Sequence, residues 1–180
     1  STYLVGENPL LSEPSSGHLE QLKELDFFVV QDVFLSETAQ LAHVVLPAAT
    51  FAEKDGTFTN TERRVQRVRK AVEPIGSAKA DWWIACQIAQ RMGSKGFGFT
   101  HPEQIMEEIA RLVPSYGGIS YDRLSQGGLQ WPCPTNEHPG TPILHVSQFT
   151  RGKGRFIPLE YKPPMELPDE DYPLLLTTER

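Results

Sequence analysis

Polar side chains that could bind a ligand follow two short apolar segments near the start of the sequence. Asn8 comes after Tyr3-Leu4-Val5 and a turn, and Gln31-Asp32 follow the apolar run at residues 27–30. Such runs are typical of strands in a parallel sheet, and ligands bind beyond the carboxyl ends of these strands. A carboxylate there suits paired donors, such as the amino-pyrimidine edge of guanine or a ribose diol. Alternatively, all three side chains only cap neighbouring helices.

A second group of candidate ligand-binding residues is basic. Lys54 lies beside Gly56 in the small, polar stretch 48–61, which we expect to be a loop. A cation at a flexible loop suits a phosphate or an anionic ring system, although an exposed lysine is usually only solvated. Five more cations, within residues 63–70, either bind an anion or pair with the surplus acids of the chain; ion pairing is the commoner case.

Neither a catalytic nor a metal-binding set of residues can be assembled from this sequence. The two cysteines, Cys86 and Cys133, form no CxxC pair, and the five histidines have no metal-ligand spacing. The GxSxG, P-loop and GxGxxG motifs are also missing. Polar strand ends without a nucleophile, base or metal set indicate a domain that holds a cofactor whose chemistry takes place elsewhere.

Composition excludes several classes of protein. The formal net charge of −6 and the pI near 5.4 argue against nucleic acid as a partner, because phosphate binding usually needs a basic surface. Apolar runs stay well short of the roughly 20 residues that cross a bilayer, and the first residues do not resemble a signal peptide. We therefore expect a cytoplasmic protein without a membrane span.

The order of the elements predicts an α/β fold. A strand is expected at residues 3–5 and buried strands at 27–31 and 44–46, with a helix over 19–25 and a short helix over 37–41 capped by Ser36. This order is that of a partial doubly wound, Rossmann-like parallel sheet with flanking helices. A further helix spans residues 82–92. Another begins with a capping box at Thr100 and Glu103, and its inward-facing residues are Ile105, Ile109, Leu112 and Val113.

The second half of the chain is harder to interpret. Prolines and glycines punctuate residues 114–168, where only 143–146 and 154–158 look like strands. The chain then finishes on Tyr172-Pro173-Leu174-Leu175-Leu176-Thr177-Thr178, which has the pattern of a buried strand. We therefore expect three parts: an α/β segment over residues 1–113, an irregular connector over 114–170, and over 171–180 the first strand of a truncated following domain.

Several stretches, in order and at matching distances, resemble the catalytic subunit of molybdopterin-dependent formate dehydrogenases, within the dimethyl sulfoxide reductase family. These stretches are Gly6-Glu7-Asn8-Pro9, residues 29–39, Val44-Val45-Leu46-Pro47-Ala48, residues 53–66 and Asp81-Trp82. The formate dehydrogenase branch is favoured by Gln130-Trp131-Pro132-Cys133-Pro134 and by residues 172–180. Two positions depart from the family pattern: His43 replaces an aspartate, and Glu179 replaces a glycine before Arg180.

The resemblance implies a bis(molybdopterin guanine dinucleotide) cofactor with molybdenum or tungsten. Position by position, it places Asn8, Gln31 and Asp32 near one nucleotide arm and Lys54 near the pterin or phosphates. Asp81 would accept hydrogen bonds from guanine, and Thr178 and Arg180 would contact the cofactor from the next domain. The molybdenum ligand, the active-site histidine and arginine and the 4Fe-4S cluster of the family precede the matching segment, so none of them is assigned here.

The resemblance also implies a function for a longer parent enzyme, of which this chain would be a fragment. That enzyme would oxidise formate to carbon dioxide and pass electrons to electron-transfer subunits, while the fragment alone would be inactive. The partners of the segment would be the remainder of the same catalytic subunit and those other subunits. The alternatives are another molybdopterin oxidoreductase, such as a nitrate reductase or the related large subunit of complex I, or a non-catalytic nucleotide-binding or interaction module.

Overall fold

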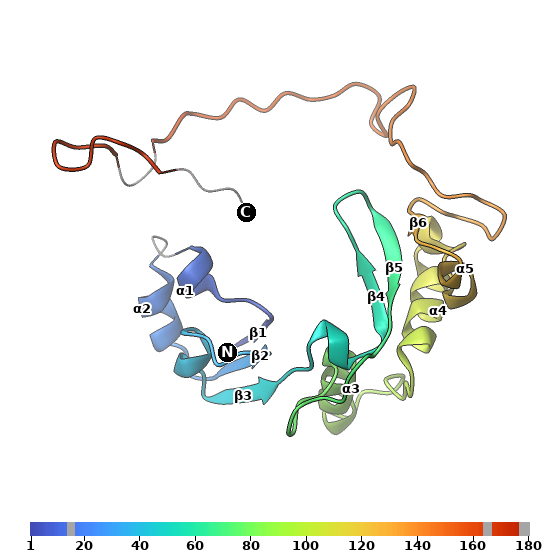
Figure 1. Cartoon of the computed structure of the whole chain (residues 1–180), viewed down its shortest axis with the longest axis horizontal. Coiled ribbons are helices and arrows are strands. Elements are labelled where there is room, and N and C mark those ends of the chain that lie inside the picture. Colours follow the sequence, from blue (N-terminus) through green and yellow to red (C-terminus); the bar gives the residue numbers. More distant parts are fainter. Residues whose placement is uncertain (14–16, 164–166, 177–180) are drawn as a thin grey trace. The chain divides into compact units, whose positions relative to one another are not determined.

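The computed structural model describes residues 1–13, 17–163 and 167–176. The chain divides into two units, Ser1–Leu144 and His145–Arg180. Figure 1 shows that the helices and strands all belong to the first unit.

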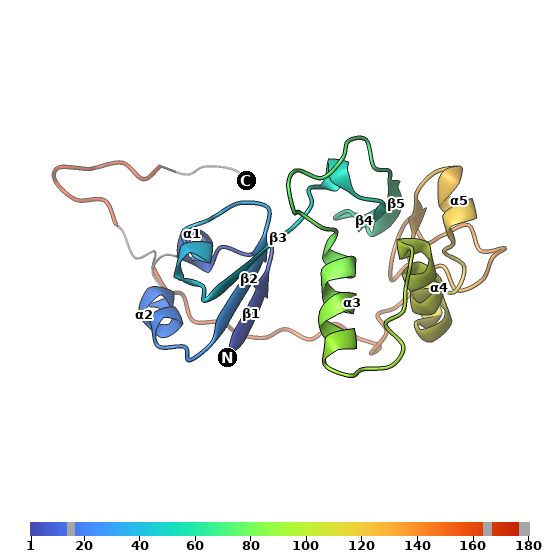
Figure 2. The ribbon, with the colours of Figure 1, turned by 90° about the horizontal axis from the view of Figure 1, so that it is seen from below.

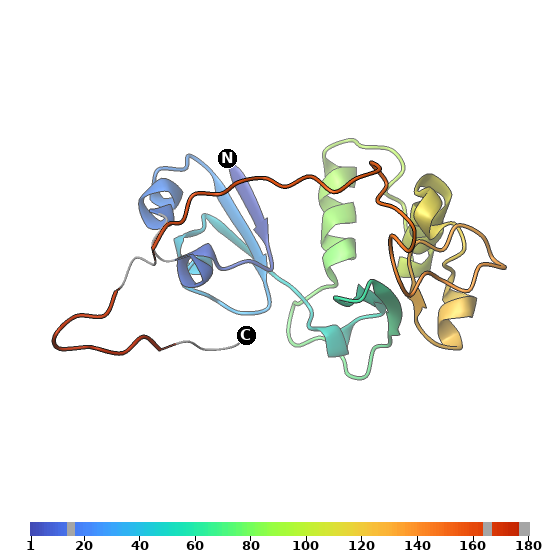
Figure 3. The same ribbon diagram turned by 90° about the horizontal axis from the view of Figure 1, so that it is seen from above.

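Three parallel strands form the sheet expected from the sequence. Strands β1 (Thr2–Val5), β2 (Phe28–Asp32) and β3 (Val44–Pro47) lie in the order β1-β2-β3, with Leu4 opposite Val30 and Val30 opposite Val45. The connections carry α1 (Pro9–Ser12), α2 (His18–Lys23) and the 3-10 helix η1 (Ala39–Leu41). Figures 2 and 3 show α1 and α2 on one side of the strands. The predicted α/β class is confirmed.

The core of this sheet lies on β2. Phe28 and Val30 are fully buried and pack against Leu22 and Leu25 near α2 and against residues of η1. Because side chains alternate along a strand, Gln31 lies on the opposite face. The short helix begins at Ala39 rather than at residue 37, and the Ser36 hydroxyl accepts a hydrogen bond from the Ala39 N–H at 3.2 Å.

Strand β3 does not have the burial expected for it. Val44 and Val45 are each 38% exposed, so the prediction of a third buried strand is correct for the strand and wrong for its burial. The physical reason is position: β3 is the last strand of this sheet and has one hydrogen-bonded neighbour. His43 precedes it, and its ring Nδ1 accepts a hydrogen bond from the Phe28 N–H at 2.9 Å.

The expected loop at residues 48–61 is instead largely structured. It contains the 3-10 helix η2 (Phe51–Glu53) and strand β4 (Gly56–Thr59), which pairs antiparallel with β5 (Arg64–Val68). Strand β5 also pairs with β6 (Leu129–Gln130). The turn between β4 and β5 is closed by Asn60, whose side-chain oxygen accepts from the Arg64 N–H at 2.9 Å. Alternation of residues in these strands is masked by their polar side chains, which explains the error.

Two longer helices follow. Helix α3 (Asp81–Arg91) agrees with the prediction, whereas α4 (Pro102–Leu112) is capped by His101 rather than by Thr100. Met106 is the buried residue of α4; Ile109, Leu112 and Val113 are 38%, 67% and 39% exposed, so these three do not face inward as predicted. The apolar side of α4 is thus only partly covered by the described residues.

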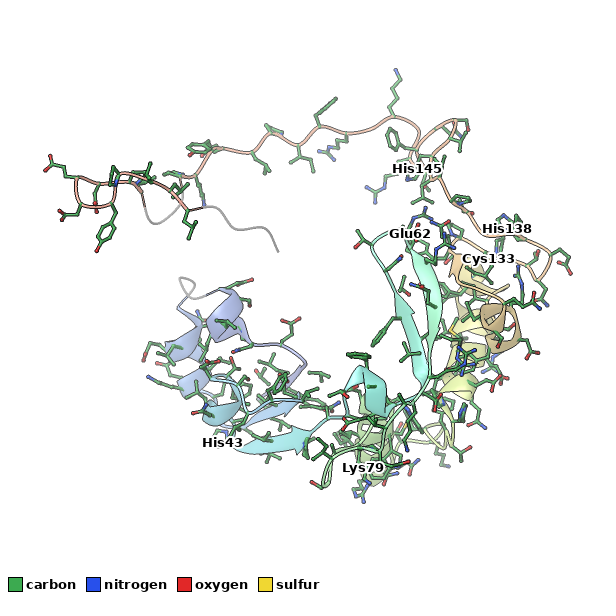
Figure 4. The ribbon with its side chains drawn as sticks, in the orientation of Figure 1. His43, Glu62, Lys79, Cys133, His138 and His145 are labelled. Atoms are coloured by element: carbon green, nitrogen blue, oxygen red, sulfur yellow. The ribbon has the colours of Figure 1, made fainter. Side chains whose placement is uncertain are left out.

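Residues 114–144 pack within the first unit and contain η3 (Pro114–Tyr116), α5 (Tyr121–Ser125) and β6. A core joins this part to β5 and α4 through Val65, Met106, Ile119, Tyr121, Leu124 and Cys133. The Sγ atom of Cys133 lies 3.3 Å from the backbone oxygen of His138, and Figure 4 labels both residues. Long-range packing, which single-sequence patterns do not register, orders a segment that we expected to be irregular.

The second unit has little regular structure. Phe149 and Gly152 form an isolated antiparallel bridge, and the strands expected at 143–146 and 154–158 are not present. Residues 171–176 form no strand, and residues 177–180 lie outside the described part. A strand forms only where it has a hydrogen-bonded neighbour, and residues 171–176 have none among the described residues. The assignment of residues 171–180 to a following domain stays a prediction, as do the other predicted domain boundaries.

Arg63 links the β4–β5 turn to residues 131–142 by hydrogen bonds. Its guanidinium donates to the backbone oxygens of Trp131, Thr141 and Pro142 and lies 5.7 Å from the centroid of the Trp131 ring. Since hydrogen bonds to a charged group contribute about 1.5–3 kcal/mol, we expect Arg63→Ala to lower the free energy of unfolding by roughly that amount. Urea unfolding measures the loss, and hydrogen exchange should show faster opening of residues 131–142.

Arg69→Ala is the matched control, because Arg69 is exposed and has no hydrogen bond or ion pair among the described residues. Equal destabilisation by both substitutions would contradict the role of the Arg63 contacts.

Candidate functional site

The start of helix α3 is held at the carboxyl edge of the parallel sheet. Ala48, directly after β3, forms a parallel bridge with Lys79, and the Ala49 N–H donates to the Lys79 oxygen at 2.8 Å. Lys79, labelled in Figure 4, precedes α3 by two residues. This bridge therefore brings Asp81, the first residue of α3, to the edge where β2 ends.

Four side chains form a continuous hydrogen-bonded chain at this edge. The amide of Gln31 is buried; its Nε2 donates to Oδ1 of Asp81 at 2.7 Å, and its Oε1 accepts from the Tyr3 hydroxyl. The second oxygen of Asp81 accepts from Nζ of Lys54. Tyr3 reaches Gln31 because it lies opposite Val29 in the register, on the same face of the sheet.

The electrostatics of this chain of contacts are favourable to a carboxylate. Asp81 lies in the first turn of α3, where the positive end of the helix dipole stabilises negative charge, and Lys54 adds a full positive charge. Partial burial raises the pKa of the Tyr3 hydroxyl, although the residue is 42% exposed, and the nearby charge of Asp81 raises it further. The Tyr3 hydroxyl is therefore kept as a neutral hydrogen-bond donor to Gln31.

Asn8 belongs to a second set of contacts. Its side-chain oxygen accepts from the hydroxyl of the buried Thr38 at 2.6 Å, and its Nδ2 donates to Glu37 at 2.9 Å. This hydrogen bond from Asn8 lowers the pKa of the Glu37 carboxyl. Asp32 accepts from the Phe34 N–H at 3.1 Å and so orders the backbone that follows β2.

The structure thus joins three of the seven predicted site residues directly: Gln31, Lys54 and Asp81. Asn8 follows β1 and Asp32 ends β2, but neither makes a hydrogen bond to those three. Asn8 bonds to the side chains of Glu37 and Thr38, and Asp32 accepts from the Phe34 N–H, so neither side chain caps a helix and the capping alternative is wrong for both. Thr178 and Arg180 lie outside the described residues. The assignments of all seven residues to cofactor contacts stay predictions.

Sequence reasoning missed the supporting residues Tyr3, Glu37 and Thr38. For Tyr3 a signal existed, because a tyrosine in an apolar strand usually has a hydrogen-bond partner for its hydroxyl. Glu37 and Thr38 gave none, since both are expected in the first turn of the short helix that Ser36 caps.

A hollow of about 250 Å³ opens beside the ion pair of Lys54 and Asp81. Its walls come from β4, α3, α4 and α5, and most of the lining side chains are apolar, among them Phe58, Trp82, Ile105, Met106, Ile109 and Tyr121. This volume is below the roughly 300–1,000 Å³ of typical ligand pockets. It is therefore too small for a nucleotide, and a nucleotide at this edge would have to lie along the surface.

The basic cluster within residues 63–70 is mostly occupied by ion pairs. Arg64 pairs with Glu62, Arg67 with Asp55, and Lys70 with Glu73. The commoner of the two interpretations, pairing with surplus acids, is the one that the structure supports. In the described part of the chain, no group of His, Cys, Asp and Glu could hold a metal ion, and no helix is long and apolar enough to cross a membrane.

Comparison with known families decides the membership of the chain. A family model described as "Molybdopterin oxidoreductase" matches residues 1–91, which contain the parallel sheet and the contacts of Gln31, Lys54 and Asp81. The chain belongs to the molybdopterin oxidoreductase family. Both the resemblance inferred from the sequence and a molybdenum–pterin cofactor for the family are thereby supported.

Individual members of the molybdopterin oxidoreductase family are similar over almost the whole chain. The F420-dependent formate dehydrogenase 2 subunit alpha of Methanococcus maripaludis is 55% identical, with 99% of this chain and 27% of that protein covered. The F420-dependent formate dehydrogenase subunit alpha of Methanocaldococcus jannaschii is 53% identical with the same coverage. The chain therefore spans about a quarter of the length of these relatives. Among solved structures, acetylene hydratase from Pelobacter acetylenicus is 25% identical over 61% of this chain and 15% of its own, with a TM-score of 0.48.

The contact between Tyr3 and Gln31 gives a pH-dependent prediction. A tyrosine with a raised pKa keeps its proton in the folded state while the unfolded chain loses it. Folding stability therefore falls as the pH rises above the unfolded pKa of about 10. We expect Tyr3→Phe to remove part of this fall, so that the difference in unfolding free energy between the two proteins shrinks from about pH 9 to pH 11.

Urea unfolding followed by circular dichroism measures this difference, with Tyr161→Phe as the control at an exposed tyrosine. A difference that stays constant with pH in Tyr3→Phe would show that the Tyr3 hydroxyl is not in the described environment.

Proposed function

We propose that this chain is part of the catalytic alpha subunit of a formate dehydrogenase. The observation that supports the proposal is the similarity to named formate dehydrogenase alpha subunits over 99% of the chain, at 50–55% identity. The parent enzyme would oxidise formate to carbon dioxide, releasing two electrons and a proton. The electrons would pass to electron-transfer subunits, and the cytoplasmic location expected from the sequence stays a prediction.

Within that enzyme, the part of the chain inside the family match would hold one guanine dinucleotide arm of a bis(molybdopterin guanine dinucleotide) cofactor. When bound, the metal centre of the cofactor supplies the redox chemistry. The residues of this chain would bind and orient the nucleotide, and none of them is proposed to take part in the reaction. A 4Fe-4S cluster would be bound by other parts of the parent enzyme.

The donors and acceptors at the carboxyl edge of the sheet fit a guanine nucleotide. Guanine offers two adjacent N–H donors, and the carboxylate of Asp81, fixed by Gln31 and Lys54, is an acceptor of matching geometry. Among the residues that the structure describes, none donates a hydrogen bond to the second carboxylate oxygen of Asp32, which could accept from a ribose hydroxyl. Lys54 would supply positive charge near a phosphate or the pterin.

The proposal predicts a defect in nucleotide binding for Asp81→Asn in the full-length holoenzyme. The substitution replaces a charged acceptor with an amide that offers one oxygen. Losing a charge-assisted hydrogen bond weakens binding by about 10- to 100-fold, so guanine nucleotide and molybdenum should both fall well below one per protein. Nucleotide released on acid denaturation and metal content measure the two occupancies.

Asp26→Asn is the matched control, since Asp26 is an exposed aspartate in the same α/β part. Full occupancy in Asp81→Asn would refute the nucleotide contact while leaving the formate dehydrogenase assignment intact. The assignment itself fails if the holoenzyme, loaded with molybdenum, reduces a dye with no formate-dependent rate or reduces nitrate instead.

A further inference from the structure

The hydrogen bonds that join Tyr3, Gln31 and Asp81 all run in one direction. The ionised carboxylate of Asp81 only accepts, so the Gln31 amide must turn its Nε2 toward that carboxylate and its Oε1 away from it. The amide oxygen in turn only accepts, and the donor that meets it is the Tyr3 hydroxyl. Gln31 therefore donates to Asp81 at one end of its amide while Tyr3 holds the other end.

The Tyr3 hydroxyl has no substitute in the described part of the chain. Gln31 is 1% exposed, so its amide depends on partners within the protein, and no other described residue donates to its Oε1. Without the hydroxyl, a buried oxygen would lack a donor, which is unfavourable. The amide can avoid this only by rotating toward another donor, and such a rotation takes Nε2 away from Asp81.

The orientation of the Asp81 carboxylate depends on Gln31 more than on Lys54. Lys54 carries a compact ammonium group on a flexible stem, which can follow an acceptor as it turns. The Gln31 amide is buried in the central strand β2 and donates from a fixed point. Because the Asp81 side chain is 36% exposed, the loss of this fixed donor would leave its carboxylate free to turn.

We propose that Tyr3 is a positioning residue for the guanine nucleotide. This inference rests on the proposed function, in which the two N–H donors of guanine meet the carboxylate of Asp81. The carboxylate accepts from both donors together only when it lies near the plane of the base. Tyr3 acts on the nucleotide through Gln31 and Asp81, which together hold the carboxylate in one orientation.

A purely structural role for Tyr3 predicts a different result. The Tyr3 hydroxyl also joins β1 to β2, so Tyr3→Phe lowers the stability of the fold in either case. If the role is structural, retention of the nucleotide follows stability from one variant to the next. If the role is positioning, retention follows the presence of the donor to Asp81.

Loss of the cofactor from the full-length holoenzyme tests the proposal. Guanine nucleotide and molybdenum that remain bound are measured over time, at a temperature well below the unfolding of every variant. Tyr3→Phe keeps the ring and removes only the hydroxyl. We expect this variant to lose both components about 5-fold faster than the unmodified enzyme, which is the effect of one neutral hydrogen bond. Tyr161→Phe, at an exposed tyrosine, should lose them at the unmodified rate.

A combined variant separates positioning from stability. Gln31→Met is apolar and removes the donor to Asp81, so we expect it to lose the cofactor at least as fast as Tyr3→Phe. Tyr3→Phe/Gln31→Met lacks both partners of the buried hydrogen bond, which should restore part of the unfolding free energy lost in Tyr3→Phe. Its cofactor loss should stay within about 2-fold of Gln31→Met, because Tyr3 then has no amide to hold.

Val30→Ala is the control for loss of stability in the same strand. Val30 is fully buried on the face of β2 opposite to Gln31, so its truncation should destabilise the fold at least as much as Tyr3→Phe. Because the contacts of Gln31 stay intact, cofactor loss should remain within about 2-fold of the unmodified rate.

Three results would overturn the proposal: an unchanged rate of cofactor loss in Tyr3→Phe, equal acceleration by Val30→Ala, or multiplied effects in the combined variant. If Asp81→Asn still lowers nucleotide occupancy, any of these results removes only the role of Tyr3 and leaves the nucleotide contact intact. If Asp81→Asn keeps full occupancy, the proposed nucleotide contact fails, and the role of Tyr3 fails with it.

Discussion

The hydrogen bond between Gln31 and Asp81 joins two parts of the first unit that are 50 positions apart in sequence. Gln31 is the next-to-last residue of the central strand of the parallel sheet and is 1% exposed, so its amide must find partners within the protein. A buried polar group without them costs about 1–3 kcal/mol. This requirement constrains where α3 begins, because Asp81 accepts from the Gln31 amide only when the first turn of the helix lies against the end of β2.

The backbone bridge between Ala48 and Lys79 also fixes where α3 begins, because Lys79 lies two residues before Asp81. The thirty residues between Ala48 and Lys79 include η2 and the β4–β5 hairpin. Because the bridge fixes the two ends of this segment, the position of Asp81 does not depend on how η2 and the hairpin pack. Lys54 then neutralises the Asp81 carboxylate from a position just before β4. The site is thus assembled by one buried amide, one backbone bridge and one ion pair, each from a different segment of the chain.

Sequence patterns predicted those parts of the fold that depend on local order. The apolar run at residues 27–30 and the polar pair Gln31-Asp32 after it predicted β2 and the position of Gln31, because a parallel strand buried on both faces needs a continuous apolar pattern. Asp81 could be connected to Gln31 only through the resemblance to a family, since no local pattern reports a contact across 50 positions. The ordering of residues 114–144 was missed for the same reason, because its core contacts come from β5 and α4. Strand β4 was missed because its polar side chains obscure the alternation along the strand.

The errors in burial have a different origin. Apolar periodicity reports which side of an element is apolar, but not whether another element covers it. Val44 and Val45 on β3, and Ile109 and Leu112 on α4, are apolar at the positions expected and yet exposed among the described residues. Apolar periodicity therefore predicts the type of an element and which of its sides is apolar. Whether that side is buried depends on the tertiary structure.

The carboxylate of Asp81 can serve both the fold and a nucleotide without a conflict between the two. A carboxylate has two oxygens with about four acceptor positions, and Gln31 and Lys54 occupy one on each oxygen. The remaining positions can accept the two N–H groups of a guanine edge while the contacts that hold α3 stay in place. Because Gln31 and Lys54 already fix the orientation of the carboxylate, little side-chain entropy is lost when a ligand binds. A residue that stabilises the fold is for this reason also a suitable acceptor in the proposed site.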